Sequence, residues 1–206
     1  MTLFVKLCGV KSEGDLEAAV EAGADAVGFV LTPSPRQIPL KVAARLNAQL
    51  PDSVLGVAVF HDPLPDLLVR AREEVGPDLF QSELSTLVGI STDRLLPVVV
   101  DSESLDRDFA LAAGSAGREM VLVDSAARGG TGLTPSWERL ARLDGPGRLI
   151  LAGGLDPDNV GEAVSLVRPF GVDVSSGIEK APGVKDPKRM RAFVEAARGV
   201  GVGGPV

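Results

Sequence analysis

Apolar residues follow two different periods along this chain, and the two periods alternate. Residues 3–8 form a short, nearly continuous apolar run, which is typical of a strand that is buried on both faces. The pattern then changes to Leu16, Ala19, Val20 and Gly23, which are spaced i, i+3, i+4 and i+7 and share one face of a helix. The same succession of run and helical pattern continues through the chain.

The apolar runs predict eight strands, and helical patterns separate them. A strict alternation of strands and helices predicts a parallel sheet with helical crossovers. A flavodoxin-like open sheet uses only about five such units, so eight units favour a closed (β/α)8 TIM barrel over a doubly wound sheet. The predicted strands are residues 3–8, 25–31, 54–60, 78–82, 95–101, 120–124, 148–152 and 171–175.

Three of the later helices have the same start signal. A residue that caps a helix well is followed by proline, which suits the first helical position. We expect helices to begin at these pairs, which are Thr134-Pro135, Asp156-Pro157 and Asp186-Pro187.

No break in composition divides the chain into two domains. We expect residues 1–198 to form one barrel-shaped catalytic domain. Residues 199–206 include four glycines, so we expect them to be a flexible C-terminal tail.

Composition limits the classes of function. The 206 residues carry 21 Lys and Arg against 28 Asp and Glu, and the formal net charge of −7 disfavours nucleic-acid binding. No apolar run is long enough to span a bilayer, and the N-terminus lacks a signal-peptide pattern, so we expect no membrane partner. A small anionic ligand stays compatible with this charge, because a local pocket can oppose it.

Cysteine and histidine are scarce. Cys8 is the only cysteine, which excludes an internal disulfide and fits the reducing cytoplasm. His61 is the only histidine, and no CxxC or HExxH motif occurs. We therefore expect no zinc site.

Cys8 and Asp124 each end a predicted strand. Barrel enzymes gather their chemistry at the C-terminal ends of the strands, so this thiol and this carboxyl are expected to face one mouth. Such a pair suits a general base and a general acid. The structural alternatives are that Cys8 is a small buried hydrophobe and that Asp124 caps a helix.

Glycine-containing turns follow the last two predicted strands. Gly153 and Gly154 follow one strand, and Ser175, Ser176 and Gly177 close the other. Glycine lets the backbone approach a ligand closely, and the loops after strands seven and eight of a barrel often bind phosphate. We expect these residues to bind a phosphorylated small molecule, although each turn on its own is also compatible with a purely structural role.

Other charged residues have weaker expectations. Arg36 lies shortly before a helix start at Pro39, which suits a loop over the mouth or a solvated loop. His61 and Asp101 are expected to be structural or exposed. Asp173 lies inside the last predicted strand and is expected to support the mouth.

Taken in order, the motifs of the chain resemble those of phosphoribosylanthranilate isomerases, enzymes of tryptophan biosynthesis. The resemblance covers nearly the whole chain. It is carried by Lys6-Leu7-Cys8-Gly9-Val10, Gly28-Phe29-Val30, Ser34-Pro35-Arg36, Gly56-Val57 with Val59-Phe60, Leu122-Val123-Asp124, Gly129-Gly130-Thr131-Gly132, Leu151-Ala152-Gly153-Gly154-Leu155, Asp173-Val174-Ser175-Ser176-Gly177-Ile178-Glu179 and Pro182-Gly183-Val184-Lys185-Asp186.

The resemblance implies a (β/α)8 fold and a cofactor-free Amadori rearrangement. N-(5-phosphoribosyl)anthranilate would become 1-(2-carboxyphenylamino)-1-deoxyribulose 5-phosphate. Carried over to this sequence, Cys8 would be the general base, Asp124 the general acid, and Arg36 would face the anthranilate carboxylate. A barrel of this size is compatible with a monomer or a homodimer.

The chemistry places demands on both groups. A free cysteine has a pKa of about 8.5, and Lys6 or a helix N-terminus could lower that pKa and supply more thiolate. An aspartate that acts as an acid must be kept protonated, so we expect Asp124 to be shielded from water when ligand is bound.

The chain departs from the family after the fourth predicted strand. The family reads Gln-Leu-His-Gly there, whereas this chain reads Gln81-Ser82-Glu83-Leu84. Two alternatives therefore stay open. The first, a phosphoribosyl isomerase of histidine biosynthesis, predicts an aspartate where Cys8 stands. The second, a barrel that binds a phosphorylated ligand without turnover, predicts that Cys8 and Asp124 are dispensable.

Overall fold

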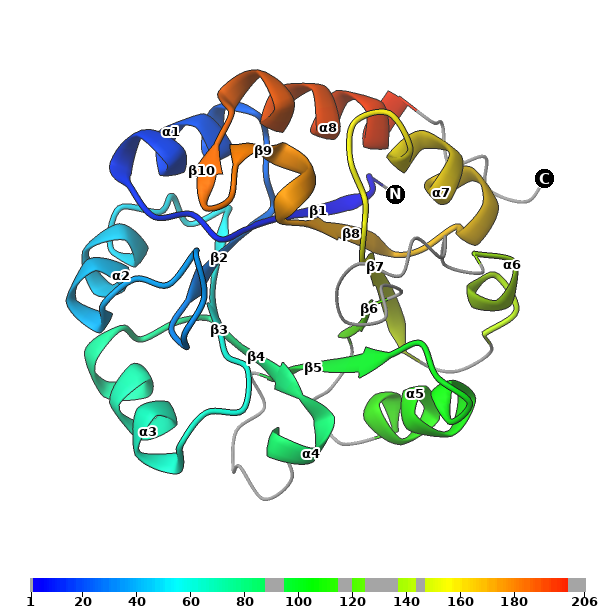
Figure 1. Cartoon of the computed structure of the whole chain (residues 1–206), viewed down its shortest axis with the longest axis horizontal. Helices are drawn as coiled ribbons and strands as arrows, with labels where there is room; N and C mark the ends of the chain where they lie inside the picture. The colour runs from blue at the N-terminus through cyan, green and yellow to red at the C-terminus, as the bar shows by residue number, and fades with distance from the viewer. Residues whose placement is uncertain (1, 88–94, 115–119, 125–136, 144–146, 200–206) are drawn as a thin grey trace.

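A closed barrel of eight parallel strands forms the centre of the computed structural model, which describes residues 2–87, 95–114, 120–124, 137–143 and 147–199 (Figure 1). Each strand pairs with the next in sequence, and β1 closes the ring by pairing with β8. The predicted TIM barrel is therefore confirmed. The strands are β1 (Phe4–Cys8), β2 (Ala26–Val30), β3 (Leu55–Val59), β4 (Leu79–Glu83), β5 (Leu95–Val100), β6 (Met120–Asp124), β7 (Arg148–Ala152) and β8 (Gly171–Val174).

Helices surround the barrel on its outer side (Figure 1). Within the described ranges they are α1 (Glu13–Glu21), α2 (Leu40–Asn47), α3 (Pro65–Glu74), α4 (Leu84–Leu87), α5 (Leu105–Ala113), α6 (Trp137–Leu140), α7 (Val160–Val167) and α8 (Pro187–Gly199). No helix in these ranges is long and apolar enough to cross a membrane.

The expected helix starts have three outcomes. The helix α8 begins at Pro187, and the Asp186 carboxylate accepts hydrogen bonds from the N–H groups of Lys188 and Arg189. Asp156 instead caps a turn, and α7 begins only at Val160, because regular helical hydrogen bonding starts after that turn. The pair at 134–135 lies outside the described residues, as do residues 200–206 of the expected tail.

A short insertion between β8 and α8 was not predicted. A 3-10 turn, η1 (Ser176–Ile178), leads into an antiparallel hairpin of β9 (Glu179–Ala181) and β10 (Val184–Lys185). The hairpin lies over the end of the barrel near β1 and α1 (Figure 1).

The barrel interior changes character from one end to the other. Alternate residues of each strand point inward, so the interior is built in layers. Its apolar layers contain Ala26, Val57, Leu96, Leu122 and Ile150. A separate and larger apolar core fills the space between the barrel and the helices. Toward the C-terminal ends of the strands, the polar strand residues Gln81, Glu83, Asp124 and Asp173 border a cavity, so this end can bind a polar ligand.

Candidate active site

A cavity of about 560 Å³ opens at the C-terminal ends of the strands. It brings together the expected site residues Arg36, Asp124, Gly153, Gly154, Ser175 and Ser176, but Cys8 and Gly177 are not among the residues that line it. The remaining lining residues are His61, Gln81, Glu83, Val98, Val100, Leu122, Ala152, Leu155, Asp173 and Val174.

Cys8 ends β1 and is almost buried, with 5% of its surface exposed. Gly28 on the neighbouring strand makes room for the thiol, since a Cβ on Gly28 would lie 2.8 Å from the Cys8 sulfur. Gly9 follows with φ +80°, and a Cβ there would lie 2.7 Å from Cδ of Arg36. The glycine after Cys8 therefore allows the Arg36 side chain to lie across the end of β1.

A buried ion pair lies on the inner surface beside Cys8. Nζ of Lys6 is 2.7 Å from Oδ1 of Asp173, and these side chains are 0% and 10% exposed. The adjacent strands β1 and β8 place Lys6 and Asp173 in register. The structure thus places Asp173 at the base of the mouth, where its contact with Lys6 supports the two strands.

Burial raises the pKa of the Cys8 thiol above its ordinary value. The charge of Lys6 acts in the opposite direction, as the sequence suggested, but Asp173 raises the pKa further. Desolvation is the largest of these effects, because a thiolate loses its hydration when it is buried. Lys6 therefore acts on the Cys8 pKa in the direction that the sequence suggested, but burial outweighs it and the net shift is upward.

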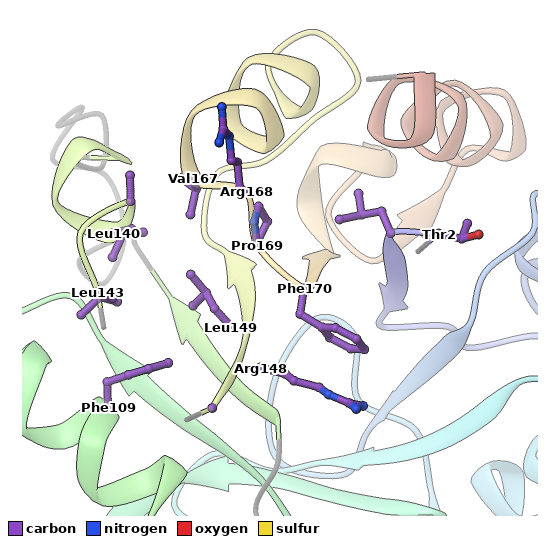
Figure 2. A pocket seen from close by; sticks show the side chains of 13 residues that line it. Thr2, Phe109, Leu140, Leu143, Arg148, Leu149, Val167, Arg168, Pro169 and Phe170 are labelled. Atoms are coloured by element: carbon purple, nitrogen blue, oxygen red, sulfur yellow. The ribbon is translucent and has the colours of Figure 1, made fainter. Parts of the chain in front are cut away.

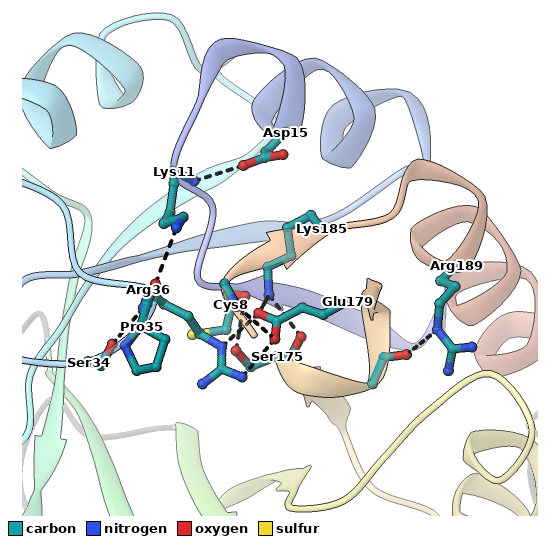
Figure 3. A network of polar contacts seen from close by, with 12 residues as sticks. Cys8, Lys11, Asp15, Ser34, Pro35, Arg36, Ser175, Glu179, Lys185 and Arg189 are labelled. Atoms are coloured by element: carbon teal, nitrogen blue, oxygen red, sulfur yellow. Dashed lines mark hydrogen bonds and ion pairs between the residues drawn. The ribbon is translucent and has the colours of Figure 1, made fainter. Parts of the chain in front are cut away.

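Arg36 is bound by a carboxylate that the sequence did not single out (Figure 3). Its Nε and Nη2 donate to Oε1 and Oε2 of Glu179 at 2.7 and 2.8 Å. Nζ of Lys185 lies 2.9 Å from Oε1 of the same carboxylate. Burial would raise the pKa of Glu179, yet the hydrogen bonds from Arg36 and Lys185 lower it to about 2. The only sign of these contacts in the sequence was that Glu179 and Lys185 belong to the two family motifs nearest the C-terminus of the chain.

The loops after β7 and β8 require glycine for geometric reasons. Gly153 and Gly154 have φ values of +92° and +66°, which residues with a side chain rarely adopt. A Cβ on Gly177 would lie 1.9 Å from the carbonyl oxygen of Leu155, so the two loops pack backbone against backbone. This close approach fixes the two loops against each other beside the cavity.

Asp124 ends β6, three strands from β1 around the barrel, and is partly exposed at the cavity. Its neighbours in register are Val100 on β5 and Ala152 on β7. The glycine motif at 129–132 lies outside the described residues. Asp124 and Cys8 thus end strands at the same end of the barrel, as expected.

His61 and Glu83 contact each other at the rim of the cavity. Nδ1 of His61 contacts Oε1 of Glu83, and Oε2 of Glu83 accepts hydrogen bonds from Ser82 Oγ at 3.0 Å and the Asp62 N–H at 3.3 Å. Burial alone would raise the pKa of Glu83, but hydrogen bonds from its own backbone N–H, from His61, from the Asp62 N–H and from Ser82 lower it below its ordinary value. The residue at which the chain departs from the resembling family therefore borders the candidate site.

A second cavity, of about 420 Å³, lies at the opposite end of the barrel (Figure 2). Leu140, Leu149 and Phe170 contribute to its lining, and the Arg148 guanidinium lies 4.8 Å from the centre of the Phe170 ring. Its position at the N-terminal strand ends separates it from all of the expected site residues. Among the described residues, no group of three or more His, Cys, Asp or Glu side chains is arranged to hold a metal ion.

Comparisons with known proteins agree along nearly the whole chain. The model of the N-(5'phosphoribosyl)anthranilate (PRA) isomerase family matches residues 5–196. An N-(5'-phosphoribosyl)anthranilate isomerase from Geobacter sp. (strain M21) is 42% identical over 205 residues, which cover 94% of this chain and 97% of the relative.

Solved structures give the same result. The phosphoribosyl anthranilate isomerase of Thermotoga maritima aligns with a TM-score of 0.81 and 36% identity, covering 96% of this chain and 99% of that one. An isomerase solved in complex with reduced 1-(o-carboxyphenylamino)-1-deoxyribulose 5-phosphate aligns with a TM-score of 0.77 and 34% identity, covering 96% and 99%.

Proposed function

The chain belongs to the N-(5'-phosphoribosyl)anthranilate isomerase family, and on that basis we propose that it converts N-(5-phosphoribosyl)anthranilate to 1-(2-carboxyphenylamino)-1-deoxyribulose 5-phosphate. The observation that carries the proposal is the mouth of the barrel. Cys8 and Asp124 end strands at this mouth, and the glycine turns after β7 and β8 border the same cavity.

The reaction is an Amadori rearrangement that needs one acid and one base. Asp124 protonates the furanose ring oxygen, so that the C1–O bond breaks and a Schiff base forms between C1 and the aromatic nitrogen. The Cys8 thiolate then removes the proton on C2, which gives an enolamine. The enolamine then gains a proton at C1 and loses the proton of the C2 hydroxyl, which gives the ketone. The proton that Asp124 gives and the proton that Cys8 takes balance. Each positioned group contributes roughly 10²–10⁴-fold to such a rate.

The substrate has two anionic ends, and the cavity offers a complement for each. The turns at Gly153, Gly154, Ser175, Ser176 and Gly177 bind the phosphate through main-chain groups, as the loops after strands seven and eight do in many barrels. Arg36, on the other side of β1, binds the ring carboxylate by charge-assisted hydrogen bonds. Held at both ends, the sugar spans the distance between base and acid.

Turnover of freshly generated phosphoribosylanthranilate tests the proposal. We expect activity in the wild type and losses of about 10²-fold or more in kcat for Cys8→Ser and for Asp124→Asn. The exposed Asp66, in the first turn of α3, provides the control Asp66→Asn, which should keep full activity.

Two outcomes would contradict the proposal. A wild type that binds the product but never turns over is a ligand-binding barrel. A wild type that isomerises only the histidine-pathway substrate is the other isomerase, although Cys8 stands where that enzyme would have aspartate. A monomer and a homodimer both stay compatible with this function, and light scattering distinguishes them.

A further inference from the structure

Among the described residues, only Glu179 accepts hydrogen bonds from the guanidinium of Arg36, and it does so along one edge. Glu179 accepts one hydrogen bond from Nε and one from Nη2. A guanidinium has five N–H groups, so three remain: one on Nη2 and both on Nη1. Arg36 also lines the cavity. The second N–H of Nη2 and one N–H of Nη1 form the terminal edge of the guanidinium, adjacent to the edge that Glu179 occupies, and this pair matches a second carboxylate in bidentate geometry.

The Glu179 carboxylate has little freedom to move. Besides Arg36, it accepts hydrogen bonds from Lys185 Nζ at 2.9 Å and from the Gly183 N–H at 3.2 Å. Lys185 is fixed in turn by a hydrogen bond of 2.8 Å to the carbonyl oxygen of Ser175. The side chains of Glu179 and Lys185 are 4% and 1% exposed.

The hairpin also contacts the loop that carries Arg36. A Cβ on Gly183, which has φ +73°, would lie only 2.3 Å from the carbonyl oxygen of Pro35. Nζ of Lys11 donates to that same oxygen at 3.2 Å, and Ser34 Oγ accepts from the Arg36 N–H at 3.0 Å. In Figure 3, Lys11 from the loop after β1 and Glu179 and Lys185 from the segment after β8 lie around the loop after β2 that carries Arg36.

The three charged groups Arg36, Lys185 and Glu179 together carry one net positive charge, which one bound anion would neutralise. Arg36 and Lys185 carry two positive charges, and Glu179 carries one negative charge. One further carboxylate on the open edge of Arg36 balances the network. A ligand that meets an already oriented guanidinium loses less side-chain freedom on binding, which increases its affinity.

We propose that Glu179, supported by Lys185, is a positioning residue that orients Arg36 toward the ring carboxylate of the substrate. The β9–β10 hairpin then determines specificity for an aromatic acid. This inference rests on the proposed function, because it assigns Arg36 to that carboxylate.

Two stable ligands separate this role from a general structural one. The first is the reduced, non-reacting product, 1-(2-carboxyphenylamino)-1-deoxyribitol 5-phosphate. The second is the same molecule without the ring carboxylate. Both keep the phosphate, so binding of the second reports whether the phosphate end is intact. Calorimetry measures the Kd of each ligand for the wild type and for Glu179→Gln.

We expect Glu179→Gln to weaken the carboxylated ligand about tenfold or more, and the ligand without the carboxylate by less than about twofold. Glu179→Asp keeps the charge but shortens the reach, and it should give an intermediate loss that is again confined to the carboxylated ligand. This second variant carries the test if Glu179→Gln does not fold. The exposed Glu74, paired with Arg70 on α3, supplies the control Glu74→Gln, which should bind both ligands normally.

Equal losses for the two ligands would overturn the inference, because Glu179 would then only support the end of the barrel. Unchanged affinities would overturn it as well. If the wild type binds neither ligand, the proposed function itself fails. If it binds both equally, the assignment of Arg36 to the carboxylate fails while phosphate binding stands.

Discussion

The two sides of the cavity mouth hold their charges in different ways. On the β1–β8 side, Lys6 and Asp173 form an ion pair whose side chains are 0% and 10% exposed. On the β3–β4 side, His61 and Glu83 form a contact whose side chains are 60% and 30% exposed. The first side has its geometry fixed before any ligand arrives. The second side faces solvent, and it includes Glu83, where the sequence analysis expects a departure from the resembling family.

The difference has a simple energetic basis. Removing one partner of a buried ion pair leaves an uncompensated charge in a medium that solvates it poorly, which costs about 3–5 kcal/mol. An exposed pair contributes only about 0–1 kcal/mol, because water competes for both groups. Change is therefore tolerated on the β3–β4 side and resisted on the β1–β8 side.

The largest effect is expected for Lys6→Met. The methionine fills a similar volume but leaves the Asp173 carboxylate buried without its partner, so the free energy of unfolding should fall by about 3 kcal/mol or more. Urea denaturation measures this change. Arg70→Met breaks the exposed pair with Glu74 on α3 and should cost no more than about 0.5 kcal/mol. Equal losses in the two variants would remove the contrast between buried and exposed pairs.

Glycine substitution extends the contrast to the loops after β7 and β8. In Gly177→Ala the new methyl group would meet the Leu155 carbonyl, so the backbone must shift and stability should fall by roughly 1–3 kcal/mol. Affinity for inorganic phosphate should fall as well. Gly14, in α1, has no atom within 4 Å of a Cβ, and Gly14→Ala should be neutral or slightly stabilising. Unaltered phosphate affinity in Gly177→Ala would exclude this loop from the phosphate site.

The raised pKa of Cys8 predicts a rate that increases with pH. Burial disfavours the thiolate, so near neutral pH only a small fraction of the base is active, and this fraction rises as pH approaches the raised pKa. In Asp124→Asn, where the acid no longer titrates, residual kcat should rise about tenfold per pH unit from about pH 6 to about pH 8. A flat profile in that variant would show that Cys8 is not the titrating base.

The smallest effect is expected at the rim. His61→Gln and Glu83→Gln each remove one partner of the exposed contact, so each should change the free energy of unfolding by less than about 1 kcal/mol. Turnover should stay within about threefold of the wild type. Steady-state kinetics and urea denaturation check both expectations. A tenfold loss of turnover in either variant would place this pair among the catalytic groups.

The barrel was predictable because its strands are buried on both faces and read as continuous apolar runs. The position of Cys8 and Asp124 at strand ends was predictable for the same reason, since each ends such a run. The hairpin was missed because β9 reads Glu-Lys-Ala and carries no apolar alternation.

Contacts between distant segments were not predictable from local patterns. Arg36 and Glu179 are 143 positions apart, and Lys6 and Asp173 are 167 positions apart. Only closure of the barrel brings either pair together. Local sequence also could not weigh burial against charge at Cys8, because the outcome depends on how deeply the folded protein encloses the thiol.

Because the hairpin follows β8, the ribosome makes the residues that hold Arg36 long after it has made Arg36 itself. Cys8 and Arg36 leave the ribosome early, whereas Glu179 and Lys185 follow after some 140 further residues. Until the last strand inserts beside the first, a nascent chain has the thiol and the arginine but nothing that holds the guanidinium in place. On this arrangement, the proposed recognition of the ring carboxylate would appear only when synthesis of the barrel is nearly complete, and a truncated chain would lack it.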